Sequence, residues 1–290
     1  MNPIESPEKN KVEKGTLYLV GTPIGNLSDL SDRAKKVLSE VDFVAAEDTR
    51  NSGKLLAAFG IIKPMVSYFE HNKREHGEQI ATRLLAGESC ALVTDAGMPA
   101  ISDPGEDIVR LCAERDVPVS VIPGPCAAVS ALALSGLPTS RFVFEGFLST
   151  ASAERKASLA MLKKETRTAI LYEAPHKLLA TLRDLYEALG DRKISLCREL
   201  TKLNEEVVRT TLSEAVTRYE NGDVRGEFVL ILAGASEEEC RKSAFWADWD
   251  VPAHVAYYVD TGMTKNEAVK AVARDRGTAK SEIYNQVMKK

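Results

Sequence analysis

The chain has 290 residues, of which 44% are hydrophobic and 28% are charged, a composition typical of a globular protein with two compact domains and a small appendage. Its five cysteines form no CxxC pair and have no histidine at ligand spacing, which excludes a disulfide framework and a zinc site. The net charge of −4 argues against a protein that grips naked nucleic acid chiefly by neutralising phosphates.

The N-terminal residues 1–14 are charged and turn-rich, and they predict a disordered tail. This tail lacks the apolar core of a signal peptide. No later stretch approaches the roughly 20 apolar residues of a membrane span. We therefore expect a cytoplasmic protein that is neither exported nor inserted into a membrane.

A first α/β domain is predicted over residues 15–124, where short apolar runs alternate with amphipathic stretches. The apolar runs predict buried strands at 16–20, 42–47, 90–94 and 119–123. Apolar residues at spacings of three and four predict helices at 31–40, 51–60, 78–87 and 106–115. Strands and helices in alternation predict a largely parallel sheet.

A second α/β domain is predicted over residues 125–236. Its strands are predicted at 142–148, 168–173, 193–199, 205–211 and 226–234, and a helix-like stretch at 213–222 separates the last two. The last three strands follow one another closely, so we expect a mixed sheet.

The remaining residues, 237–290, are polar and predict a small helical module of helix-turn-helix type, in which Thr264 and Thr278 each precede a helix.

Three turn-rich loops follow predicted strands, at the edge where open α/β sheets bind ligands. The loop at 21–29 is not a dinucleotide fingerprint, because Pro23 and Ile24 break the glycine spacing. The loop at 94–105 has two glycines, two prolines and two aspartates, which let backbone approach a ligand. A third loop begins at 122 with Pro-Gly-Pro. A tight turn explains the first loop equally well, and close helix packing explains the third nearly as well.

Several ordered blocks resemble the tetrapyrrole (corrin/porphyrin) methylase superfamily from about residue 16 to 234. They are LVGTPIGNLSDLSDRA, AAEDTRNSGKLL, LVTDAGMPAISDPG, VIPGPCAAVSALALSGLP, FEGFL, YEAPHKL, CRELTKLNEE and RGEFVLILAG. The resemblance implies the two-domain fold of class III methyltransferases, with a parallel N-terminal sheet, a mixed second sheet and a small helical C-terminal module. The tail matches that module more loosely.

The resemblance also implies that S-adenosylmethionine binds between the two α/β domains. The contacts that it implies by position are Ile24, Gly97, Met98, Ile101, Cys126, Ala127, Tyr172, Leu196 and Phe228. Many members have Gly-Asp-Pro where this chain has Gly97-Met98-Pro99. The acidic contact of that motif is therefore absent at Met98, and Asp95 or Asp103 is left as a candidate replacement.

The substrate implied by the resemblance is the ribose 2′-hydroxyl of a cytidine in the decoding region of 16S rRNA, as free rRNA or as an assembled small subunit. It also implies a homodimer. Arg198 and Lys202 supply two cations at a strand end and are candidate RNA contacts, although they are equally able to pair with Glu199 and Glu205 as surface ions. We expect the module at 237–290 to assist RNA binding, because residues 250–290 carry seven Lys and Arg against five Asp and Glu.

Methyl transfer to a ribose hydroxyl needs a group that accepts the proton or favours the developing alkoxide. Two pairs at strand ends offer such groups, Asp48 with Arg50 and Glu173 with His176. Helix capping by Asp48 and helix opening at His176 are the alternative interpretations. The other histidines show no partner in the sequence and are predicted to lie on the surface.

Two other functions fit the same sequence features. One is an enzyme of the same superfamily acting on a small tetrapyrrole or on a protein residue; a tetrapyrrole would need a broad apolar trough, and the polar EDTR and YEAPHK clusters favour a polar substrate. A regulatory nucleotide-binding module without catalysis would use the helical tail as its output. Binding of S-adenosylmethionine and methyl transfer into RNA separate these functions.

Overall fold

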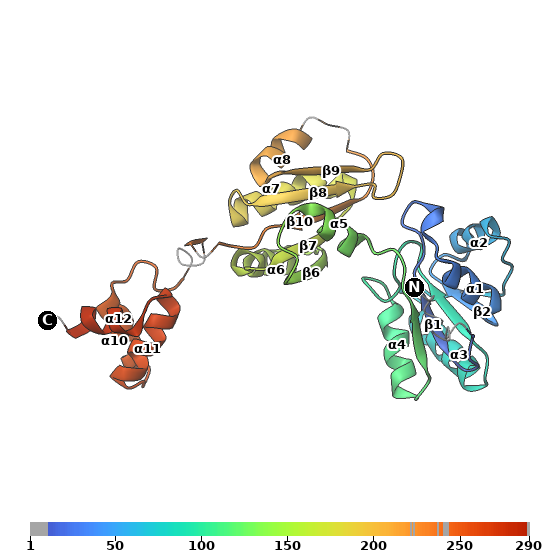
Figure 1. Ribbon diagram of the computed structural model, residues 1–290, viewed down its shortest axis with the longest axis horizontal. Coiled ribbons are helices and arrows are strands. Elements are labelled where there is room, and N and C mark those ends of the chain that lie inside the picture. Colours follow the sequence, from blue (N-terminus) through green and yellow to red (C-terminus); the bar gives the residue numbers. More distant parts are fainter. Residues whose placement is uncertain (1–10, 221, 223, 237, 240–243, 289–290) are drawn as a thin grey trace, which may run out of the picture.

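The computed structural model describes residues 11–220, 222, 224–236, 238–239 and 244–288. Figure 1 shows two α/β domains followed by a small helical module that lies beyond the second domain. The tail predicted at 1–14 lies mostly outside the described residues. The predicted fold class, with a parallel first sheet and a mixed second sheet, is confirmed.

The first sheet has five parallel strands in the order β3-β2-β4-β1-β5. These strands are β1 (Leu17–Val20), β2 (Phe43–Ala46), β3 (Met65–Ser67), β4 (Cys90–Val93) and β5 (Val119–Ile122). The helices between them are η1 (Leu27–Asp29), α1 (Asp32–Glu40), α2 (Thr49–Ala58), α3 (Lys73–Leu85) and α4 (Gly105–Glu114). Among the strands of this sheet, the short edge strand β3 was not predicted, and the 3-10 helix η1 lies in a stretch that was predicted as a loop.

The first domain forms because its central strands are buried on both faces by apolar side chains. Every residue of β2 and β4 is buried, and separate apolar clusters cover the two faces of the sheet. Full burial of one such aliphatic side chain stabilises the fold by about 1.5–3 kcal/mol. Helices α1 and α2 begin at capping side chains: Ser31 accepts a hydrogen bond from the backbone N–H of Ala34, and Asp48 accepts one from that of Arg50.

The second sheet has the order β6-β7-β10-β8-β9, and only β6 and β7 run parallel. Its strands are β6 (Phe142–Phe147), β7 (Thr168–Glu173), β8 (Lys193–Arg198), β9 (Glu206–Thr211) and β10 (Phe228–Leu232). Its helices are α5 (Ala127–Ser135), α6 (Ser152–Lys164), η2 (Pro175–Lys177), α7 (Leu178–Leu189) and α8 (Leu212–Tyr219). Helix α5 packs on β8 and β10, so we propose the domain boundary just before it, at 124 and 125.

The C-terminal module has its own core between α10 (Val251–Asp260), α11 (Lys265–Arg276) and α12 (Lys280–Met288). The predicted helix start at Thr264 is confirmed as a capping box with Glu267. The predicted helical stretch at 237–249 lies partly outside the described residues, and its residues 245–248 form a turn. None of the helices in the described ranges combines the length and apolar character that a membrane crossing needs.

The surface position predicted for His254 was wrong. Its side chain is fully buried between the rings of Trp246 and Tyr258, and its Nδ1 accepts a hydrogen bond from Arg276. Burial lowers the pKa of His254 below its ordinary value. His254 therefore belongs to the core of the module, where aromatic packing holds the neutral imidazole.

Candidate active site

A cleft of about 1020 Å³ lies between the two α/β domains. In the first domain it is lined by residues that follow β1, β2 and β4, such as Ile24, Glu47 and Thr94. In the second domain it is lined by residues at one end of the strands, including Tyr172 near the end of β7 and Phe228 at the start of β10. Ligands of open α/β sheets bind at the carboxyl ends of strands, so this cleft is the candidate active site.

The floor of the cleft depends on close backbone contact between the loops that follow β1, β4 and β5. A Cβ on Gly21 would lie 2.7 Å from the Cα of Gly124, so only glycine allows these two loops to meet. The backbone N–H of Thr22 donates to the carbonyl of Gly97 at 2.9 Å, and the N–H of Gly97 donates back at 3.2 Å. The three turn-rich loops identified in the sequence are therefore brought together.

The loop after β4 holds a strained backbone beside the cleft. Ala100 and Ser102 have left-handed φ angles of 67° and 62°, which cost about 1–3 kcal/mol each in residues other than glycine. Asp103 stabilises this conformation, because its Oδ1 accepts hydrogen bonds from the N–H groups of Ala100 (2.9 Å) and Gly105 (2.7 Å). Its other oxygen, Oδ2, is buried and has no hydrogen-bond partner among the described residues. Strain with an unpartnered acceptor is typical of a ligand site.

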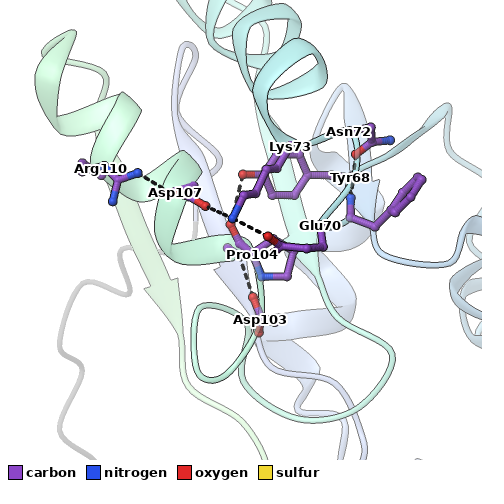
Figure 2. Close-up of polar contacts among 10 residues, drawn as sticks. Tyr68, Glu70, Asn72, Lys73, Asp103, Pro104, Asp107 and Arg110 are labelled. Atoms are coloured by element: carbon purple, nitrogen blue, oxygen red, sulfur yellow. Dashed lines mark hydrogen bonds and ion pairs between the residues drawn. The ribbon is translucent and has the colours of Figure 1, made fainter. Parts of the chain in front are cut away.

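A polar clamp fixes the exit of this loop to the neighbouring helix α3, as Figure 2 shows. The hydroxyl of Tyr68 donates to the carbonyl of Pro104 at 3.0 Å. The Nζ of Lys73 lies 2.7 Å from carboxylate oxygens of both Glu70 and Asp107. Hydrogen bonds to these two carboxylates, with Asp107 contributing most, raise the pKa of Lys73. The ammonium therefore stays charged at neutral pH and the clamp persists.

Five of the predicted cofactor contacts line the cleft, namely Ile24, Ile101, Ala127, Tyr172 and Phe228. Gly97 and Cys126 are each next to a residue that lines it, and Met98 lies in the same loop as Gly97. The side chain of Leu196 packs instead into the core on the other face of the second sheet, and its neighbour Cys197 lines the cleft. Burial raises the pKa of Tyr172 to about 12, so its hydroxyl remains protonated. The binding roles themselves stay predictions.

Asp48 and Arg50 form an ion pair directly beyond Glu47, and neither is among the residues that line the cleft. Arg50 donates through Nε to Oδ1 of Asp48 at 3.1 Å and through Nη2 to Oδ2 at 2.7 Å. Hydrogen bonding from Arg50 lowers the pKa of Asp48 to about 2. The Arg50 side chain is 85% exposed, so it is available to an approaching polyanion. The capping role predicted for Asp48 is confirmed, and the catalytic role stays a prediction.

Glu173 and His176 both line the cleft from the second domain. Glu173 is buried at the end of β7, where its Oε1 accepts from the backbone N–H of Ala174 at 2.9 Å and its Oε2 accepts from the hydroxyl of Thr181 at 2.5 Å. His176 lies in the 3-10 turn that begins at Pro175, is exposed, and has no hydrogen-bond partner among the described residues. The pair therefore combines a fixed carboxylate with an accessible imidazole.

The cleft is strongly acidic. Eight carboxylates line it, those of Glu47, Glu70, Asp95, Asp103, Glu106, Glu173, Glu199 and Glu227. Lys202 is the only lysine or arginine among its described lining residues, and its Nζ lies 2.9 Å from carboxylate oxygens of both Glu199 and Glu227. An RNA phosphate would meet repulsion there. The predicted pairing of Lys202 with Glu199 is therefore present, and its role as an RNA contact stays a prediction.

Arg198, the other predicted RNA contact, is not among the residues that line the cleft. Its Nε donates to Glu206 at 3.2 Å rather than to the predicted Glu199 or Glu205. Residues of β8 alternate between the two faces of the sheet, which explains why Cys197 lines the cleft and Arg198 does not.

Sequence reasoning did not single out several residues that shape this site. Glu70, Glu106 and Glu227 line the cleft, and Tyr68 and Lys73 hold its loop in place. Glu227 immediately precedes β10, so its position at a strand end was the available signal. Tyr68 and Lys73 follow the short strand β3, which was not predicted, and no signal therefore pointed to them.

Comparisons with known proteins agree with this geometry. Residues 16–216 match the family model described as Tetrapyrrole (Corrin/Porphyrin) Methylases. Over 273 residues the chain is 47% identical to Ribosomal RNA small subunit methyltransferase I of Halalkalibacterium halodurans, and the match covers 94% of each chain. The protein of the same name from Bacillus subtilis is 45% identical over 276 residues, which is 95% of this chain and 94% of that one.

Solved structures show the same fold at lower sequence identity. Cobalt precorrin-4 methyltransferase is 17% identical, with a TM-score of 0.57 over 76% of this chain and 95% of that one. A uroporphyrin-III C-methyltransferase from Thermus thermophilus in complex with S-adenosylhomocysteine is 22% identical, with a TM-score of 0.53 over 75% of this chain and 97% of that one. The C-terminal module lies outside the residues that the family model matches.

Proposed function

This chain belongs to the tetrapyrrole (corrin/porphyrin) methylase family, and from that premise we propose that it is an rRNA methyltransferase that uses S-adenosylmethionine. The finer proposal is transfer of the methyl group to the ribose 2′-hydroxyl of a cytidine in the decoding region of 16S rRNA. The observation that carries the rRNA methyltransferase is near full-length identity of 45–47% to relatives named for methylation of small-subunit rRNA, and the cytidine ribose target rests on the resemblance of the sequence blocks alone. Because its substrate is ribosomal RNA, we propose that it acts in the cytoplasm.

The residues of the cleft fit S-adenosylmethionine. The excess of carboxylates suits a ligand that carries sulfonium and ammonium charges. The unpartnered Oδ2 of Asp103 is an acceptor in need of a donor. Phe147 and Tyr172 line the cleft with their ring centroids 5.6 Å apart, and these aromatic side chains suit a planar heterocycle.

When bound, S-adenosylmethionine supplies an electrophilic methyl group. The protein has to hold the ribose hydroxyl in line with that group, exclude water and accept the hydroxyl proton. We propose that the loops fixed by Gly97 and by the Tyr68–Lys73 clamp provide the rigid binding surface. The proton acceptor belongs to one of two pairs, Asp48 with Arg50 or Glu173 with His176.

The two pairs differ in what they offer. Arg50 is exposed beside the cleft and is able to stabilise negative charge on oxygen or phosphate. Its bond to Asp48 lowers the pKa of that carboxyl to about 2, which makes Asp48 a weak base until Arg50 turns to the substrate. Glu173 and His176 already line the cleft. The turnover of variants in each pair decides between them.

We also propose a homodimer. The two sheets present exposed apolar side chains on their edge strands, Val119 and Val121 on β5 and Phe142 on β6. Exposed apolar edge strands associate unless they are covered, and a second copy of the chain is the proposed cover. Light scattering should give twice the chain mass, and Phe142→Lys should shift the protein toward the monomer. A monomeric parent chain would contradict this proposal.

The function is tested with purified protein, tritiated S-adenosylmethionine and small ribosomal subunits or protein-free 16S rRNA. We expect label in the RNA and, after digestion to nucleosides, in 2′-O-methylcytidine. Label in a base would support an RNA methyltransferase but contradict transfer to the ribose. Label only in a tetrapyrrole or protein substrate would support the same-superfamily alternatives, and cofactor binding without any transfer would support a regulatory module.

A further inference from the structure

A second pocket, which is basic and has a volume of about 350 Å³, adjoins the acidic cleft. Arg198, Arg218 and Arg225 line it, with Glu206 as the one carboxylate among its described lining residues. Phe228 lines both the pocket and the cleft. The two hollows are therefore neighbours with opposite charge.

The pairing of neighbouring strands in the second sheet places the side chains that line this pocket next to one another. Arg198 is paired in register with Phe228 of β10 on one side and with Glu206 of β9 on the other. Helix α8 supplies Arg218, whose Nη2 lies 2.8 Å from Oε1 of Glu206. The sheet and the last turn of α8 thus bring arginines from separate elements to one place.

The guanidinium groups of Arg198 and Arg218 have unused donors. Arg198 uses its Nε for Glu206 and its Nη1 for the carbonyl of Arg225, and Arg218 uses its Nη2 for the same Glu206. Each guanidinium has five N–H groups, so donors remain on both. The hydroxyl of Tyr219 in the pocket wall is buried and has no hydrogen-bond partner among the described residues. A small anion with several acceptor oxygens satisfies this arrangement.

We propose that this basic pocket binds a phosphate of the RNA strand whose nucleoside enters the acidic cleft, an inference that rests on the proposed function. A ribose is able to enter the cleft, but its phosphates are repelled by the eight carboxylates there. The pocket across Phe228 offers the compensating positive charge. Arg198 and Arg218 bind the RNA backbone at a phosphate, and the cleft accommodates the sugar and base.

The test compares Arg218→Gln with the parent protein, using small ribosomal subunits and protein-free 16S rRNA as separate probes. For whichever RNA probe the parent binds, the affinity of Arg218→Gln should be about tenfold lower. The slope of log affinity against log salt concentration should also decrease in magnitude by about one. The KM for RNA should rise while kcat is kept. Calorimetric affinity for S-adenosylmethionine should stay within twofold.

Arg183→Gln is the matched control, because Arg183 is an exposed arginine of the same domain that pairs with Glu220 and lines neither hollow. It removes the same charge and should leave RNA affinity within twofold. Arg198→Gln is a second variant that should repeat the Arg218 result, with the thermal unfolding of each variant confirming that it folds.

If the parent methylates RNA and both pocket variants bind it like the control, the pocket assignment is overturned and the proposed function stands. If the parent neither binds nor methylates either RNA probe, both proposals fail together. Equal weakening by Arg183→Gln would also contradict the pocket, because it would indicate a diffuse effect of net charge.

Discussion

The acidic cleft and the basic pocket share Phe228 as a common wall, yet they differ in charge and in construction. The cleft is built from loops of both domains with close backbone contacts, strained residues and carboxylates. The pocket is built from side chains of one domain, on regular strands and a helix. From this difference we propose that the cleft holds the cationic cofactor in fixed geometry and that the pocket holds a polyanion through long, adaptable side chains.

The largest expected effect comes from placing a bulky side chain in the floor of the cleft. Gly97 has a φ of 89°, and a Cβ there would lie 3.4 Å from Ile24 and 3.5 Å from the carbonyl of Pro125. Gly97→Leu should therefore abolish binding of S-adenosylmethionine in calorimetry and leave RNA binding within about threefold.

Gly60→Leu is the control, because Gly60 also has a left-handed φ but has open space around it. It should lose stability and retain the cofactor. A folded Gly97→Leu variant with parental affinity for S-adenosylmethionine would show that the cofactor does not depend on these loops.

The next largest effect concerns the chemistry at the rim of the cleft. If Asp48 and Arg50 are catalytic, Asp48→Asn and Arg50→Ala should each lower kcat by about a hundredfold or more, while cofactor affinity barely changes. Single-turnover rates with saturating RNA are the measurement. Turnover within about threefold of the parent for both variants would reduce this pair to its capping role. Glu173→Gln and His176→Ala should then show the hundredfold loss instead.

A smaller effect is expected from removing the C-terminal module, which we expect to assist RNA binding together with the basic pocket. Removing residues 244–290 deletes a unit with its own core and keeps the contact between Arg192 and Glu239. RNA affinity should fall about tenfold, since several cationic contacts are lost, and cofactor affinity should stay within twofold. Loss of cofactor binding on truncation would show that the module completes the cleft or the dimer.

The smallest effect is a pH dependence at the ion pair of Asp48 and Arg50. The folded pKa of Asp48 is about 2, against an ordinary value of 3.8. Because the folded value is the lower one, the stabilisation is fully present above about pH 4 and is lost as the pH falls through 2. Urea unfolding of the parent and of Asp48→Asn should differ most near neutral pH and converge in acid. A difference that does not change with pH would mean that capping geometry, rather than charge, sets the stability of this helix start.

The sequence predicts the fold well where burial is continuous and poorly where it is partial. The strands β1, β2, β4 and β10 are runs of buried apolar residues, and they were predicted to within a few residues at either end. Strand β3 has three half-buried residues at a sheet edge and gives no such signal. His254 was misplaced because its partners, Trp246 and Arg276, come together only when the module folds.

The loops of the candidate site were predictable because glycine and proline mark close backbone approach locally, as Gly97 does. The acidic character of the site was not predictable from the sequence. Glu70, Asp103 and Glu227 come from separate loops, and their convergence follows from the packing of two domains. The basic pocket was not predicted for the same reason. Arg198 and Arg218 are 20 residues apart in the sequence, and both contact Glu206 in the folded chain.

The most direct test of the whole account is a map of ribose methylation in small-subunit rRNA from cells that lack this protein. One cytidine in the decoding region should lose its 2′-O-methyl group. A plasmid carrying the parent gene should restore it, and one carrying Gly97→Leu should not. A methylation map identical to that of parent cells would contradict the account.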